Sequence, residues 1–319
     1  MSGAPDRQAV WLSRTSSSTA RAARLALHGW TPDHRLMTGC LEPVFAARPG
    51  YRRIYPDLPG MGRTPIGAVT DGDDLLAAVE QVIDERIGAA PFLLLGESYG
   101  GYLARAIAHR RPSQVLGLAL ICSAGTVLNG ERTVPPRSVV VADPELIASL
   151  DPAERDEYAE MAVVQSAETL RRFREEILSG AALADQEALA RLRPRRELSQ
   201  GPETATPYPG PALILAGRQD AVAGYHDVYP LLDHYPRASF AVLDRRPQPP
   251  DRGPGAVRFA AQRVAGPGRG NLHTATRARS VNGCGGLRHF GDTCDLPNDR
   301  RYVCQLTEES VVTARALAV

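Results

Sequence analysis

The residues best suited to chemistry lie in the segment Gly96-Glu97-Ser98-Tyr99-Gly100-Gly101, which follows four apolar residues, 92–95. A serine on a sharp turn between a strand and a helix exposes its hydroxyl, and glycines on either side of it avoid a clash within the turn. A glycine-rich turn without chemistry would look similar. However, the strand-like run before this turn and the helix-forming run after it, 99–109, favour a nucleophilic role for Ser98.

A second turn, His28-Gly29-Trp30-Thr31, follows the strand-like residues 22–27. Its glycine lets the chain turn closely, so that the backbone N–H groups beyond it can face a ligand. We expect the N–H groups of Trp30 and Tyr99 to form an oxyanion hole beside Ser98. For His28 we favour a structural role, as a buried histidine that hydrogen-bonds neighbouring loops, over a catalytic one.

A carboxylate suited to the same chemistry follows the apolar run 212–216, in Gly217-Arg218-Gln219-Asp220. A serine nucleophile needs a base, commonly histidine, and a carboxylate that orients that base. An acid just beyond the end of a strand, on a loop beside the turn of Ser98, is well placed for the second task. We therefore predict that Asp220 orients the base.

The segments that must position these residues alternate between strand and helix patterns. Strand-like runs lie at 22–27, 53–55, 92–95, 115–121, 212–216 and 239–244, and helix-like runs begin at Asp71 and cover 99–109 and 225–234. Alternation of this kind predicts an α/β fold, with a mostly parallel, doubly wound sheet and helices on both faces.

Residues 125–206 interrupt this alternation with a highly charged, helix-like block. Because the block follows the strand after the Ser98 helix, we expect it to cover the catalytic end of the sheet as a helical cap. A solvated helical insertion with no influence on specificity is the alternative. The predicted organisation is a core in two parts, 1–124 and 207–244, with the cap between them.

Composition narrows the range of partners. The 319 residues have a net charge of +1, which argues against a dedicated nucleic-acid-binding protein and leaves a small-molecule substrate. No apolar run reaches the ~18 residues of a membrane span, and the first residues lack the hydrophobic segment of a signal peptide, so we expect no membrane contact and a cytoplasmic location. Cys40 and Cys122 lie in apolar segments and are expected to be buried thiols. Nothing in the sequence indicates an oligomeric state.

Residues 22–244 resemble the α/β-hydrolase superfamily, in its serine-nucleophile branch. The matching pieces, in chain order, are His28-Gly29-Trp30, Asp57-Leu58-Pro59-Gly60-Met61-Gly62, Gly96-Glu97-Ser98-Tyr99-Gly100-Gly101 and Gly217-Arg218-Gln219-Asp220. The resemblance implies an eight-stranded, mostly parallel sheet and no metal or organic cofactor. It also implies a triad in the order Ser98, Asp220 and a histidine after the last strand, which hydrolyses a small ester, amide or related acyl substrate through an acyl-enzyme.

The sequence departs from the family after Asp244, because the next histidine is His273. Residues 245–319 contain 12 arginines and 6 acidic residues and are rich in proline and glycine, so we expect an atypical, poorly ordered tail. Without an imidazole base, hydrolysis by Ser98 would be impaired. His273 or His289 could act as a substitute base. Alternatively, the chain is a non-catalytic member of the family that binds a ligand or a partner.

A shift of reading frame near Arg245 would explain both the missing histidine and the change in composition. Codons permitted for residues 245–253, read one base later, can encode Ala-Gly-His-Asn-Leu-Gln-Ile-Glu. This reading places a histidine motif in the slot where the family has one, and later codons permit a closing helix. The third bases were chosen freely, so the result shows compatibility with a frame shift.

Overall fold

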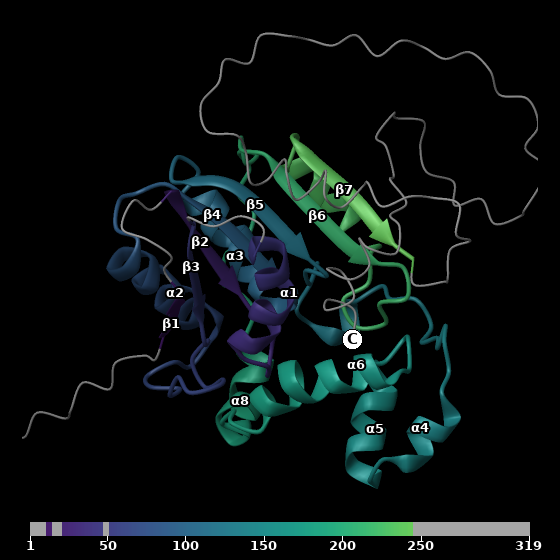
Figure 1. Cartoon of the computed structure of the whole chain (residues 1–319). Helices are drawn as coiled ribbons and strands as arrows, with labels where there is room; N and C mark the ends of the chain where they lie inside the picture. Colours follow the sequence, from purple (N-terminus) through teal and green to yellow (C-terminus); the bar gives the residue numbers. More distant parts are fainter. Residues whose placement is uncertain (1–10, 15–20, 47–50, 245–319) are drawn as a thin grey trace, which may run out of the picture.

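The computed structural model describes residues 11–14, 21–46 and 51–244. Within these ranges the chain forms a sheet flanked by helices, with a group of further helices at one end (Figure 1). The expected tail, 245–319, lies outside the described residues, as do His273 and His289.

The sheet has seven strands in the described part of the chain, in the order β1-β3-β2-β4-β5-β6-β7. Their bounds are Trp11–Arg14 for β1, Arg21–Leu27 for β2, Tyr51–Pro56 for β3, Phe92–Glu97 for β4, Val115–Ile121 for β5, Ala212–Gly217 for β6 and Ala238–Leu243 for β7. Strand β1 pairs antiparallel with β3, and all other neighbours are parallel. The predicted α/β fold with a mostly parallel sheet is confirmed.

Helices cover both faces of the sheet because successive strand residues point to opposite sides. On one face, α2 (Gly72–Arg86) and α3 (Ser98–Arg110) pack against a large apolar cluster that includes Leu25 and Leu94. On the other, α1 (His34–Ala46) packs against a cluster that includes Leu95. The predicted start of α2 at Asp71 is confirmed, because the Asp71 side chain accepts a hydrogen bond from the Asp74 N–H at the N-terminus of the helix.

The block between β5 and β6 is helical, as its composition predicts. It contains α4 (Pro144–Ser149), α5 (Pro152–Met161), α6 (Ala167–Arg172), the π-helical turn η2 (Phe173–Leu178), α7 (Ser179–Ala181) and α8 (Gln186–Leu192), with short 3-10 turns η1 (Asn129–Glu131) and η3 (Arg193–Arg195). Figure 1 shows these helices together, near the end of the sheet toward which β6 and β7 point. The division into core and cap remains a prediction.

Two elements differ from the sequence analysis. Helix α1 was not predicted, although its buried residues Leu36, Met37, Cys40 and Leu41 follow helical spacing. The helix predicted over 225–234 is wrong in its first half, since residues 225–228 are not helical. Only the second half is helical, as the 3-10 helix η4 (Tyr229–His234). Its Pro230 fits a first turn, where no N–H is needed, but would interrupt a helix that began at 225.

Candidate active site

Ser98 occupies a strained position at the junction of β4 and α3. Its φ angle is 47°, a left-handed value that is uncommon for residues other than glycine. The backbone around it is tightly packed: a Cβ on Gly96 would lie 2.4 Å from the Gly100 carbonyl oxygen, and one on Gly100 would lie 2.4 Å from the His28 carbonyl oxygen. The requirement for glycine at these two positions is therefore confirmed.

A cavity of about 170 Å³ opens beside Ser98. The core contributes residues from loops at the ends of strands, and the insertion contributes the opposite wall. The lining consists of Gly29, Trp30, Pro32, Leu36, Glu97, Ser98, Cys122, Arg137, Ser138, Glu160, Met161, Ala162, Val163, Ile177, Gln219, Asp220, Ala221, Val222 and Ala223. Three of the four predicted site residues in the described chain, Trp30, Ser98 and Asp220, thus lie at one cavity.

Asp220 is held by the backbone that follows it. Its Oδ1 accepts hydrogen bonds of 2.9 Å from the N–H groups of both Val222 and Ala223. Its Oδ2 has no hydrogen bond among the described residues, so one carboxylate oxygen is fixed and the other is available to a partner. This arrangement suits a carboxylate that orients a base.

Trp30 and Tyr99 lie side by side, with ring centroids 5.2 Å apart in an edge-to-face arrangement. The Tyr99 side chain is buried and its hydroxyl donates to the Arg196 carbonyl oxygen at 2.8 Å, so it does not line the cavity. Its backbone N–H is the second of α3, where no intrahelical carbonyl can accept it. The backbone N–H of Trp30 has no hydrogen-bond acceptor in the described part of the chain. Both donors are thus available, and the oxyanion hole remains a prediction.

His28 is a structural residue, as the sequence analysis favours. It is fully buried; its Nδ1 donates to the Gly29 carbonyl oxygen at 2.8 Å, and its Nε2 accepts from the Leu58 N–H at 3.0 Å. Burial lowers the pKa of His28 from its usual value, which keeps the ring neutral and able to accept that bond. The ring therefore ties the Gly29 turn to the loop after β3.

None of the histidines in the described ranges lines the cavity; they are His28, His34, His109, His226 and His234. The base that the resemblance implies is therefore not found among these residues. The structure instead reveals a carboxyl group that the sequence analysis did not single out, on Glu97, directly before Ser98. Burial and the charge of Asp220 raise the pKa of Glu97 to about 8, against the effect of a hydrogen bond from the Gly29 N–H.

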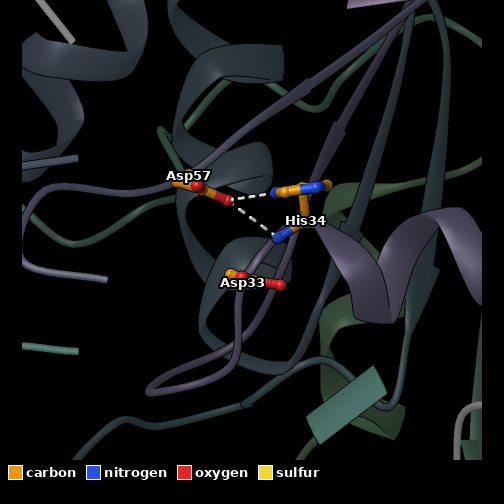
Figure 2. A group of neighbouring side chains, drawn as sticks. All are labelled: Asp33, His34 and Asp57. Carbon is orange, nitrogen blue, oxygen red and sulfur yellow. Dashed lines mark hydrogen bonds and ion pairs between the residues drawn. The ribbon is translucent and has the colours of Figure 1, made fainter. Parts of the chain in front are cut away.

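Asp33, His34 and Asp57 form a polar cluster (Figure 2). Asp57 Oδ1 accepts hydrogen bonds from the His34 N–H and from His34 Nδ1, at 2.9 and 2.7 Å, and Oδ2 accepts from the Arg63 N–H at 3.1 Å. Asp33 pairs with Arg35. These ligand-type atoms already have protein partners, which indicates that the loop after β3 is a structural scaffold.

Comparisons with known proteins agree with this architecture. The alpha/beta hydrolase fold family matches residues 25–245. A hydrolase structure from Oenococcus oeni shares 28% identity, with a TM-score of 0.64 over 74% of this chain and 86% of that one. A thermophilic esterase from Thermogutta terrifontis, at 19% identity, has a TM-score of 0.52 over 74% of this chain and 84% of that one and shows the fold alone.

Curated relatives match over shorter segments. The lipase LipV of Mycobacterium tuberculosis is 34% identical over 134 residues, 41% of this chain and 46% of that protein. A pimeloyl-[acyl-carrier protein] methyl ester esterase of Shewanella woodyi is 39% identical over 98 residues, 30% of this chain and 34% of that protein. The matches thus span less than half the length of these relatives. The family match, which covers most of the chain, shows that it belongs to the alpha/beta hydrolase fold family.

Proposed function

We propose that this chain is a serine hydrolase that acts on a small ester, amide or related acyl substrate through an acyl-enzyme. One observation supports this above all: Ser98 and Asp220, far apart in sequence, line the same cavity beside the turn of Gly29 and Trp30. The family match and the curated relatives named as a lipase and an esterase support the same class of reaction.

In the proposed mechanism, the Ser98 hydroxyl attacks the substrate carbonyl while a histidine, oriented by Asp220, accepts the hydroxyl proton. The N–H groups of Trp30 and Tyr99 stabilise the oxyanion of the tetrahedral intermediate. The protonated base then donates to the leaving group, and water attacks the acyl-enzyme by the reverse route. No metal or organic cofactor enters any of these steps.

The helical insertion is proposed to act as a cap that selects the acyl group. Its residues Glu160, Val163 and Ile177 face the cavity opposite Ser98. A volume of about 170 Å³ is close to that of an engineered cavity of about 150 Å³ that admits benzene, so a short acyl chain or a single ring would fit. We therefore expect small substrates to react faster than long-chain esters.

The catalytic base is the part of the proposed site that is not found among the described residues of this chain. We propose that loss of the family histidine impairs its hydrolysis, and that a reading-frame shift near residue 245 is the cause. The family match ends at residue 245, where the composition also changes. Sequencing the coding DNA across this point tests the shift directly, because the offset frame must encode Ala-Gly-His followed by a helix-forming segment. A tail in frame throughout would leave His273 and His289 as the candidate bases.

A non-catalytic binding protein is the second candidate, favoured by the lack of a histidine at the cavity among the described residues. Hydrolysis of p-nitrophenyl acetate, butyrate and decanoate by the full chain separates the two functions. The hydrolase proposal expects slow turnover that prefers the short esters and is lost in Ser98→Ala. Turnover that is unchanged in Ser98→Ala would contradict it, and saturable binding of an ester without turnover would favour the second candidate.

A further inference from the structure

Glu97 lies between the proposed nucleophile and the turn that supplies an oxyanion donor. It is the last residue of β4, half-buried, and it lines the cavity together with Ser98 and Asp220. A Cβ on Gly29 would lie 2.3 Å from Glu97 Oε2 and 3.0 Å from the Ser98 Cβ. The carboxyl group is thus packed against the residue that precedes Trp30, at the edge of the predicted oxyanion hole.

The groups packed against Glu97 favour its neutral form, and the same cavity is also lined by Arg137 and Glu160 of the insertion, one of each charge. Asp220, on the loop after β6, contributes a negative charge, and Cys40 of α1 contributes a buried thiol. Beyond Cys40, Arg172 is already paired with Glu176 at 2.8 Å. Cys122, at the end of β5, lines the same cavity. In the described part of the chain, no arginine or protonated histidine forms an ion pair with Glu97, and the Gly29 N–H is its one neutral donor.

We propose that Glu97 works as a neutral carboxylic acid at the edge of the oxyanion hole, where it donates a hydrogen bond to the anionic oxygen of a bound acyl group. This inference rests on the proposed function, since it adds a third donor to the predicted N–H groups of Trp30 and Tyr99. A carboxylic acid kept neutral by its surroundings can donate in this way, whereas a carboxylate at the same place would repel the oxyanion.

The neutral form of Glu97 determines how the affinity of the site for an anion depends on pH. Because burial and Asp220 raise the pKa of Glu97 to about 8, most of the protein carries the donor at neutral pH. As pH rises through that value the donor becomes a like charge, and the affinity of the site for an anion falls. If Glu97 were instead the base for Ser98, ionisation would increase activity and Glu97→Gln would abolish it, which is the opposite pattern.

Binding of butyrate, a carboxylate that mimics an acyl product, tests the inference without any catalytic turnover. Calorimetric titration of the full-length Ser98→Ala chain from about pH 6 to about pH 9 is expected to show roughly tenfold weaker binding at the upper end, as the neutral fraction of Glu97 falls. In Ser98→Ala/Glu97→Gln, which retains a neutral donor, the affinity should no longer change with pH. The matched control is Ser98→Ala/Glu187→Gln, which removes an exposed carboxylate outside the cavity lining and should keep the pH dependence.

Three results would overturn the inference: no butyrate binding at about pH 6, an affinity independent of pH, or a pH dependence that persists in the Glu97→Gln background. Each is separate from failure of the proposed function, which is measured by ester turnover with Ser98 intact. A chain that binds butyrate in the expected manner but never turns over an ester would keep the Glu97 donor and favour the non-catalytic binding protein. Ser98→Ala/Glu97→Ala adds a last check, since loss of the donor should weaken binding at every pH.

Discussion

Gly96 and Gly100 are the residues on which the position of Ser98 depends most directly. A Cβ added to either glycine would meet backbone carbonyl oxygens, which cannot rotate away as a side chain can. The sequence allowed this to be predicted because the requirement is local to the turn. The place of Asp220 at the cavity could be expected in the same way, from its position just after a strand, while its role in orienting a base stays a prediction. Glu97 could not, because its proximity to Gly29 and Asp220 arises only when three separate strands are assembled.

Substitution of Gly100 by alanine should therefore destabilise the protein. The added Cβ would meet the Leu27 and His28 carbonyl oxygens at 2.4 Å, so the backbone must shift, and the free energy of unfolding should fall by about 1–3 kcal/mol or more. Urea denaturation measures the change. Gly130→Ala is the control, because no atom lies within 4 Å of its Cβ, and it should alter stability by no more than about 0.5 kcal/mol. Equal effects of the two substitutions would refute the packing argument.

Asp57 gives a second prediction, with a defined pH dependence. Burial raises the pKa of this carboxyl, but hydrogen bonds from the His34 side chain and from the His34 and Arg63 N–H groups outweigh it and hold the pKa below its usual 3.8. The ionised form therefore stabilises the fold above about pH 4, and this contribution is lost as pH falls through the lowered pKa.

Asp57→Asn should lower the free energy of unfolding by about 1–3 kcal/mol at neutral pH, because the amide cannot replace the carboxylate at all three donors. The difference from the unmodified chain should shrink as the pH falls below about 4. Urea denaturation at both pH values measures it. A difference that stays constant with pH would show that the charge of Asp57 does not contribute to stability.

At the scale of elements, the strands and α3 could be predicted because their patterns are strong and continuous. Helix α1 was missed although Leu36, Met37, Cys40 and Leu41 have helical spacing, since Pro43 within it reads as a break. The π-helical turn η2 has no distinct signal, because Phe173 and Ile177 would also suit a regular helix. The contacts between the insertion and the core could not be predicted, since they join residues far apart in sequence.

A buried ion pair connects α3 to the last part of the insertion and provides the third prediction. Arg105 pairs with Glu203, with side chains only 2% and 10% exposed, and Tyr235 donates to the same carboxylate at 3.1 Å. Glu203→Gln would leave the guanidinium buried without a counter-charge and should cost about 3–5 kcal/mol of stability.

The matched control for this prediction is Glu187→Gln, which breaks an exposed pair with Arg191 and should change the free energy of unfolding by less than about 1 kcal/mol. Both variants are compared with the unmodified chain by denaturant titration. A cost of Glu203→Gln as small as that of the control would mean that solvent reaches Arg105 freely.

At the scale of the whole molecule, the core of the family is present through β7, and no described helix is long and apolar enough to span a membrane. The histidine that the proposed mechanism uses as its base is not found at the cavity among the described residues. Restoring the offset reading frame from codon 245 should therefore increase ester hydrolysis by on the order of 10⁴-fold, the typical cost of removing a triad member. Initial rates of p-nitrophenyl butyrate hydrolysis by the two chains measure this. Equal rates would show that the given chain already has its base or that neither chain is a hydrolase.

The most direct test of the central claim, that Ser98 is the nucleophile, is the intact mass of the protein after incubation with a fluorophosphonate probe. We expect a single covalent adduct, formed slowly on the given chain and rapidly on the frame-restored chain, and absent from Ser98→Ala in both. Peptide mapping should place it on Ser98. An adduct that persists in Ser98→Ala, or no adduct on the frame-restored chain, would contradict the account.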